Sequence, residues 1–158
     1  MIRTVRFVPA FVAALSVVAA APVLAAHGTH DNVDDDHLAV QGYDVVAYFT
    51  TGKAARGDKA ITAGHGGHTY RFASSENKRK FLEAPEKYVP QYGGWCATAM
   101  AEGKKVEIDP ATFKITGGKL YLFYNGFWGN ALKDWNKDES NNIVKADRLW
   151  KGILTKKP

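Results

Sequence analysis

Alternating apolar and polar residues indicate strands in three parts of the chain. The stretches 43–50 (YDVVAYFT) and 68–73 (HTYRFA) are rich in aromatic and β-branched residues, which favour strands. In a third part, 113–124, the alternating runs FKIT and KLYLFY flank Gly117 and Gly118, and a two-residue glycine loop is typical of a β-hairpin. We therefore expect a small, mostly antiparallel sheet built from these three parts.

Four other segments carry apolar residues at helical spacing. In the first, Phe81 and Tyr88 lie on one face behind a serine that can cap the helix. Near the C-terminus the apolar stripes contain Trp128, Trp135 and Trp150, which we expect to be core anchors. The pattern predicts an α+β fold with helices near 75–84, 97–102, 129–137 and 140–154, packed on the sheet.

The first 26 residues have the layout of a secretory signal peptide. Arg3 and Arg6 precede an uncharged run rich in Ala and Val that ends in small residues. An uncleaved anchor is the alternative, because about 20 apolar residues can cross a bilayer. Pro9 and Pro22 interrupt this run, which favours cleavage. We expect a periplasmic or secreted protein without a stable membrane span after cleavage.

The chain is long enough for one compact domain. The full sequence has 158 residues, 46% of them hydrophobic, so a single core is expected. Residues 27–39 are polar and lack a core-facing pattern, so they predict a mobile arm rich in His and Asp. Residues 40–158 would then form the folded domain with a helical C-terminal extension.

The charge pattern argues against nucleic-acid binding. The formal net charge is +5, and removal of Arg3 and Arg6 with the signal peptide would lower it by two. The remaining basic residues are interspersed with acidic ones and form no basic tract of the kind that binds nucleic acids. A metal ion or a periplasmic partner protein is the expected partner.

One segment combines an aromatic strand, a short turn and a lysine-rich helix that ends in Pro-Glu-Lys-Tyr. This segment, HTYRFASSENKRKFLEAPEKYVPQY, resembles the YHS domain, a small module of copper-transporting P-type ATPases and many other proteins. The likeness covers about residues 40–92, since GYDVVAYF is similar to the opening strand of the family. The remainder resembles longer exported members, which continue through a GGxCA segment and an Asp-Pro turn. The resemblance implies a YHS/TRASH-like α+β fold.

The chain departs from the metal-binding members of this family. Those members place cysteines in the opening strand and at two positions around the strand-to-helix turn. The matching positions here hold Ala47, Ala73 and Asn77, and none of these residues supplies a thiolate. Copper and other soft metals need sulfur or imidazole ligands, so any metal must be held elsewhere.

Cys96 is the single cysteine of the chain and the first candidate ligand. If a helix starts here, Met100 would project from the same face one turn later, and a thiolate with a thioether suits copper(I). His65 or His68 could supply a third ligand. The alternative is that Cys96 and Met100 only fill the core, because both residue types are commonly buried.

The arm supplies a second candidate metal site. It contains His27, His30 and His37 among aspartates, and imidazole with carboxylate suits copper(II), zinc or nickel(II). Ordering such an arm around a metal costs conformational entropy, so a low affinity is expected. His65 and His68, which lie in a glycine-rich loop, could instead be merely solvated.

Two further functions remain open, and catalysis has little support. The sequence has no phosphate-binding glycine loop, no nucleophile elbow and no His-Glu-x-x-His zinc-binding motif. A metal-free binding or accessory module could dock a partner protein or an apolar ligand, and a redox role of Cys96 would need a second thiol from another chain. The docking surface would be aromatic, formed for example by Tyr92, Trp95, Tyr121 and Phe127.

Overall fold

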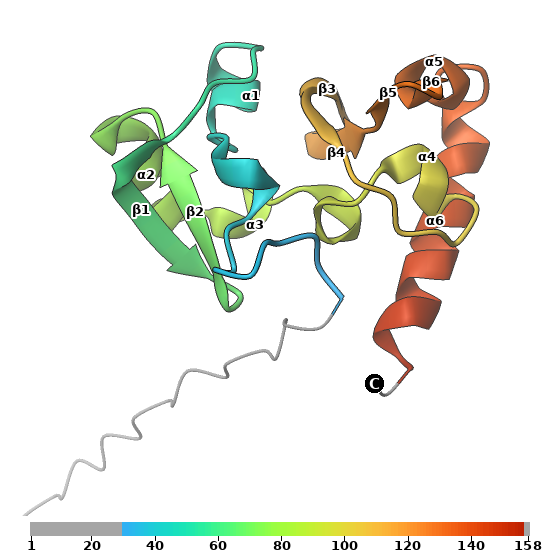
Figure 1. The fold of residues 1–158 in the computed structure, drawn as a ribbon, viewed down its shortest axis with the longest axis horizontal. Coiled ribbons are helices and arrows are strands. Elements are labelled where there is room, and N and C mark those ends of the chain that lie inside the picture. The colour runs from blue at the N-terminus through green and yellow to red at the C-terminus, as the bar shows by residue number, and fades with distance from the viewer. Residues whose placement is uncertain (1–29, 157–158) are drawn as a thin grey trace, which may run out of the picture.

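The computed structural model describes residues 30–156 of the chain. Within that range, short antiparallel hairpins alternate with helices (Figure 1), so the fold is α+β. The strands pair into three separate two-stranded sheets instead of the one sheet expected from the sequence. The predicted signal peptide lies outside the described residues.

The first half of the domain is built around one hairpin with short helices beside it. Its strands β1 and β2 pair in antiparallel fashion, with His65 opposite His68 across a turn of two glycines. The elements are the 3-10 turn Val40–Gly42, α1 (Ala47–Thr50), β1 (Asp58–His65), β2 (His68–Phe72), α2 (Ser75–Glu83) and α3 (Pro85–Tyr88).

The predicted strand over 43–50 is wrong, because this segment forms the short helix α1 at its end. The carboxylate of Asp44 accepts hydrogen bonds from the backbone N–H groups of Val46 and Ala47, which holds the chain in a turn and starts the helix. The strand β1 was not predicted, since its residues are exposed or half-buried and show no apolar alternation.

The helix predicted over 75–84 is confirmed as α2. The Ser74 hydroxyl accepts a hydrogen bond from the Asn77 N–H at 3.1 Å and caps its start. Pro85 begins the separate helix α3, as its missing N–H and fixed φ favour at a first helical position.

The second half holds the predicted hairpin over 113–124 and the C-terminal helices. The hairpin turns at Gly117 and Gly118, both with positive φ, and its strands extend over Asp109–Thr116 and Lys119–Phe123. The elements are the 3-10 turn Gln91–Gly94, α4 (Ala97–Met100), β3 (Asp109–Thr116), β4 (Lys119–Phe123), β5 (Asn125–Gly126), β6 (Gly129–Asn130), α5 (Ala131–Trp135) and α6 (Glu139–Leu154).

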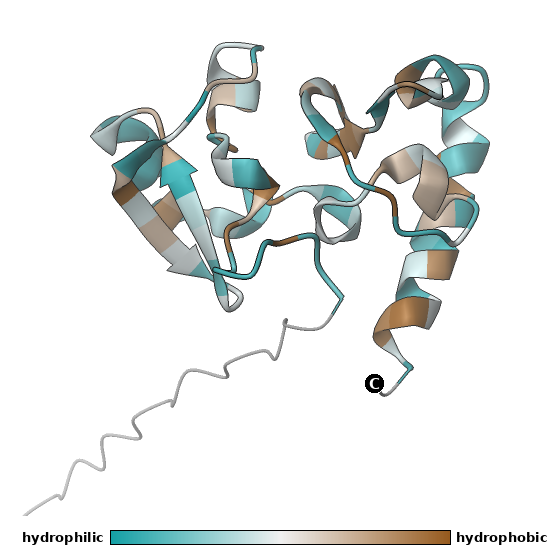
Figure 2. Ribbon diagram, in the orientation of Figure 1, coloured by the Kyte–Doolittle hydropathy of each residue, from teal (hydrophilic) through white to brown (hydrophobic). Residues whose placement is uncertain are grey.

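The strand β4 separates two clusters of buried residues. Leu120 and Leu122 belong to the cluster shared with the first half, whereas Tyr121 and Phe123 belong to the cluster around Trp135 and α6. Successive side chains of a strand point to opposite faces, so β4 is buried on both sides. Apolar bands alternate with polar ones along α6 (Figure 2).

The three tryptophans expected in the core differ in burial. Trp135 is fully buried and Trp150 packs at the edge of the same cluster, which confirms their prediction as core anchors. Trp128 is 85% exposed at the tip of the β5–β6 hairpin, stacked edge-on against Phe127, so its prediction is wrong. The helical spacing misled here because residues 129–130 form a strand.

None of the helices within residues 30–156 combines the length and the apolar character that crossing a membrane requires.

Candidate ligand cleft at the end of the first hairpin

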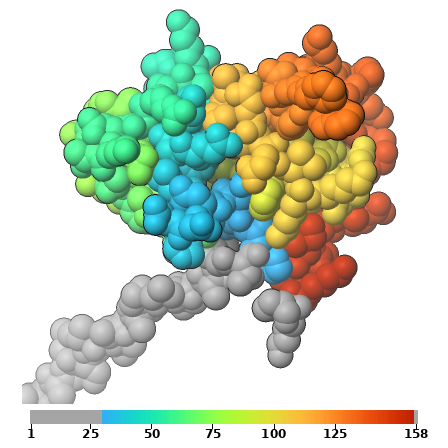
Figure 3. All heavy atoms as spheres, viewed as in Figure 1, coloured from blue at the N-terminus to red at the C-terminus, as the bar shows by residue number. Residues whose placement is uncertain are grey.

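The described part of the predicted arm packs against the domain. Leu38 forms a bridge with Thr69 of β2, and the Ala39 N–H donates to the Thr69 carbonyl at 2.9 Å. The indole N–H of Trp95 donates to the His30 carbonyl at 2.6 Å. Residues 30 to 40 thus lie between the two halves of the molecule, as Figure 3 shows in blue, and do not stand free as the expected mobile arm.

Gly93 allows the arm to approach the second half closely. The Asn32 N–H donates to the Gly93 carbonyl at 2.8 Å, and a Cβ at Gly93 would overlap the carboxylate of Asp31. Gly93 also has a φ of +59°, which strains any other L-residue. The absence of a side chain at Gly93 therefore makes room for Asp31.

Asp31 pairs with His68 in a buried contact. Nε2 of His68 donates to Oδ2 of Asp31 at 2.8 Å, and the His68 side chain is 4% exposed. Because a carboxylate only accepts, the Nε2 nitrogen of His68 carries a proton. Its Nδ1 has no hydrogen-bond partner among the described residues.

His65 forms a similar pair on the other side. Its Nε2 lies 2.9 Å from Oε1 of Glu86 in α3, a pair that is far more exposed than the first. His65 and His68 are opposite residues of an antiparallel hairpin, so their side chains lie on one face of it.

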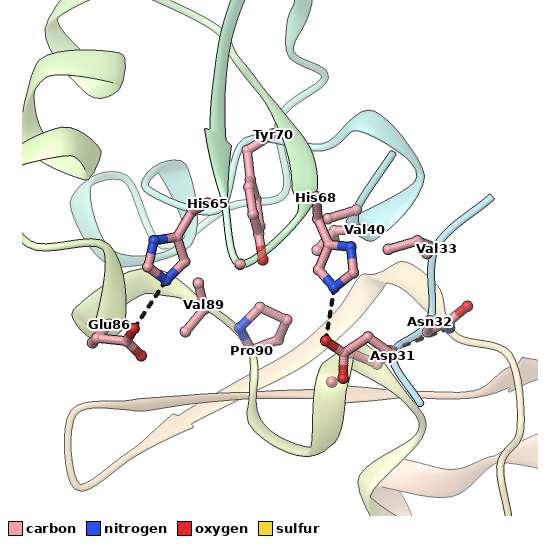
Figure 4. A pocket seen from close by; sticks show the side chains of 14 residues that line it. Asp31, Asn32, Val33, Val40, His65, His68, Tyr70, Glu86, Val89 and Pro90 are labelled. Carbon is pink, nitrogen blue, oxygen red and sulfur yellow. Dashed lines mark hydrogen bonds and ion pairs between the residues drawn. The ribbon is translucent and has the colours of Figure 1, made fainter. Parts of the chain in front are cut away.

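Tyr70 lies between the two imidazoles. Its hydroxyl points into a cavity of about 150 Å³ (Figure 4), and within residues 30–156 no group hydrogen-bonds it. Burial first, and then the nearby carboxylates of Asp31 and Glu86, raise the pKa of Tyr70 above its ordinary value. The hydroxyl therefore stays protonated.

Cys96 and Met100 do not share a face. Cys96 is the residue before α4 and is 1% exposed in the cluster that contains Leu120 and Leu122. Met100 is fully buried in the other cluster, around Trp135. Neither lines the cleft of His65 and His68. The structure therefore does not bring the expected soft ligands together.

The two described histidines of the arm contact the domain through their backbone carbonyls. His27 lies outside the described residues. The backbone carbonyl of His30 accepts a hydrogen bond from the Trp95 indole. The His37 side chain is exposed, and its backbone carbonyl accepts a hydrogen bond from the Thr69 N–H. Among residues 30–156, nowhere do three or more His, Cys, Asp or Glu side chains gather closely enough to hold a metal ion.

The aromatic docking surface suggested by the sequence is dispersed. Tyr92 and Tyr121 are buried at 3% and 2% exposure, Trp95 is half-buried, and Phe127 is 90% exposed on a distant hairpin. These four residues therefore do not form one surface.

Three residues of the cleft were not singled out as site residues. Asp31 was one of several aspartates of the arm, Tyr70 was a strand residue, and Glu86 belonged to the Pro-Glu-Lys-Tyr pattern. No local signal distinguishes them, since Asp31 and Glu86 are 37 and 21 positions away from their histidines.

Ala47, Ala73 and Asn77 all hydrogen-bond Asp44. Its carboxylate is fully buried and accepts from the N–H groups of Ala47 and Ala73 and from the side-chain amide of Asn77. A hydrogen-bonded carboxylate thus joins α1 to the β2–α2 turn.

Comparisons with known proteins add little. No family model matches the chain, and no solved structure matches it. A curated β-xylosidase of Xylanibacter ruminicola is 42% identical over 45 residues, which is 28% of this chain and 13% of that protein. Because the chain spans only this small part of the relative, nothing of that protein's activity is carried over.

Proposed function

We propose that the chain is a non-catalytic binding module, exported and YHS-like, whose ligand site is the cleft around Tyr70. The Tyr70 hydroxyl carries the proposal: the residue is 5% exposed, and its oxygen faces the cavity without a hydrogen-bond partner among the described residues (Figure 4). Among the described residues, the buried side-chain atom without a hydrogen-bond partner is Nδ1 of His68, and buried polar groups are nearly always partnered. The Tyr70 hydroxyl reaches the open cavity, where a ligand atom can hydrogen-bond it.

The groups around the cleft favour binding over bond-making chemistry. Each imidazole is already engaged with a carboxylate through Nε2. The described residues that line the cleft include no Ser, Thr, Cys or Lys, and the carboxylates, which could also act as nucleophiles, are hydrogen-bonded to histidines. The cleft combines a few hydrogen-bonding side chains with apolar residues such as Val89 and Pro90, which is the usual composition of a ligand site.

The hydrogen bonds of Asp44 support the YHS-like part of the proposal. Ala47, Ala73 and Asn77 are 26 and 4 positions apart in sequence, yet all three bind one carboxylate. In the metal-binding members that the sequence resembles, the matching positions hold cysteines. A buried carboxylate with donors around it would take the structural place of a metal there.

Copper handling is the second candidate. The observation that favours it is the placement of His65 and His68 opposite each other on one hairpin face, because two imidazoles are good copper ligands. Cys96 and Met100 would become ligands only if the core opened, since both are buried.

A thermal-shift screen with small polar molecules tests the first candidate. Ligands should raise the melting temperature of the mature protein and of the Tyr43→Phe control, but raise that of Tyr70→Phe less. Tyr43 is a half-buried tyrosine outside the cleft. Equal shifts in all three proteins, or no shift with any compound, would remove the cleft as the ligand site.

Copper(I) titration against a competing chelator tests the second candidate. A double variant, His65→Gln with His68→Gln, should lose affinity, while Cys96→Ala should keep it. Loss of affinity in Cys96→Ala alone would assign copper to the thiol instead.

A further inference from the structure

The charges of the cleft oppose those of the whole chain. The chain carries a formal net charge of +5, yet the described residues lining the cleft include the carboxylates of Asp31 and Glu86, each paired with a histidine, and no Lys or Arg. A cleft lined by one sign of charge attracts ligands of the opposite sign. The cleft is therefore suited to a cation.

The two carboxylates lie on opposite sides of the cavity. Figure 4 shows Asp31 beside His68 on one side and Glu86 beside His65 on the other. Each carboxylate accepts one hydrogen bond from its histidine and keeps further lone pairs, since a carboxylate has about four acceptor sites. Both carboxylates can thus accept further hydrogen bonds from a ligand.

Apolar groups lie between these two ends. Val89 and Pro90 separate the carboxylates along the cleft in Figure 4, and the ring of Tyr70 stands above them. The cavity of about 150 Å³ is roughly ten times the ~10–15 Å³ that holds one water molecule on the same measure. The space therefore has room for a small organic ligand.

We propose that this cleft binds a short aliphatic diamine, one ammonium at Asp31, the other at Glu86, and the methylene chain over Val89 and Pro90. The Tyr70 hydroxyl oxygen accepts from the ammonium nearer to it. The proposal rests on the cleft being the ligand site. It adds the chemical class of the ligand.

The two ends differ in burial, which predicts unequal contributions. The Asp31 side chain is 16% exposed, whereas that of Glu86 is 81% exposed. Solvent screens exposed ion pairs strongly, so Asp31 should contribute more to affinity than Glu86. A ligand bound at Asp31 alone would be a monoamine.

Calorimetric titration with three matched probes tests the inference. The probes are 1,4-diaminobutane, n-butylamine and 1,4-butanediol, which share the four-carbon chain and differ in charge. We expect the diamine to bind roughly tenfold or more tightly than the diol, about 1.4 kcal/mol per tenfold, with the monoamine between them. High salt should weaken the diamine most.

Isosteric variants assign the two ends. Asp31→Asn should reduce diamine affinity by roughly tenfold, and Glu86→Gln should remove the preference for the diamine over the monoamine. Glu102→Gln, an exposed carboxylate outside the cleft, should change nothing. Because Glu86 is exposed, its variant tests the proposal even if Asp31→Asn unfolds.

The outcomes separate the ligand class from the site itself. Diol binding as tight as diamine binding overturns the diamine while leaving the cleft as the ligand site. The same holds if all three probes fail but another compound shifts wild type more than Tyr70→Phe. If no compound binds at the cleft, the ligand class and the proposed function both fail.

Discussion

The side-chain amide of Asn77 donates a 2.6 Å hydrogen bond to the buried carboxylate of Asp44. The same oxygen accepts from the Ala73 N–H at 2.8 Å, and the other accepts from the Val46 N–H at 2.8 Å. One side chain thereby fixes the start of α1 against the turn between β2 and α2. This contact anchors the hairpin that carries the cleft.

Asp44→Asn should destabilise the fold strongly. An amide group presents N–H donors to the donors that now bind the carboxylate, so buried groups lose their partners. We expect the free energy of unfolding to fall by about 3 kcal/mol. Chemical denaturation measures it, with Asp58→Asn as the control because Asp58 is exposed and accepts only a local bond from Ala60. Equal losses in both variants would contradict the role of Asp44.

If the YHS-like proposal holds, cysteines introduced at three positions should create a metal site. The variant Ala47→Cys, Ala73→Cys and Asn77→Cys places thiols on three residues that hydrogen-bond Asp44, and thiolates bind zinc strongly. We expect zinc affinity roughly tenfold or more above that of wild type. The matched control carries serine at the same positions. Equal zinc affinity in both variants would argue against the YHS-like arrangement.

The Cys96 thiol should be unreactive in the native protein. It is 1% exposed, and thiol reagents require access. Labelling should occur only after unfolding, as followed by mass spectrometry with and without denaturant. Rapid labelling of native protein would bring back the redox role.

Cys96→Ser should lower the free energy of unfolding by about 1–3 kcal/mol, because it buries a hydroxyl in an apolar cluster. Chemical denaturation checks this value, and Cys96→Ala separates the loss of volume from the added polarity. A stable serine variant would show that the site is hydrated.

Glu139 should make the fold sensitive to acid. Burial alone would raise its pKa, but hydrogen bonds from Lys114, Thr116 and Trp135 outweigh burial and lower the pKa. A lowered folded-state pKa gives stability that is present above the unfolded pKa and lost as the pH falls through the folded pKa.

We therefore expect wild type to exceed Glu139→Gln in stability near neutral pH by about 1–2 kcal/mol, and this difference to shrink on acidification. Denaturation at about pH 6 and about pH 3, on either side of the usual glutamate pKa of about 4.3, measures the change. The exposed Glu107→Gln is the control. A difference that grows in acid would contradict the assignment.

The sequence predicted those elements whose signals are local. Ser74 and Pro85 mark the two ends of α2 and the start of α3, and Gly117 and Gly118 mark the turn of the second hairpin. These features depend on backbone conformation and on hydrogen bonds within a few residues. The failure over 43–50 has a local cause, because hydrogen bonds from the N–H groups of Val46 and Ala47 to the carboxylate of Asp44 hold a segment rich in strand-forming residues in a turn.

The amino-acid pattern by itself thus determined the α+β class, the helix α2, the hairpin over 113–124 and the burial of Trp135. Tertiary structure alone decided that Asp31 meets His68, that Glu86 meets His65, and that Cys96 and Met100 enter different cores. The physical reason is distance along the chain: periodicity and capping act within a few residues, whereas a cleft forms where segments far apart in sequence are packed side by side.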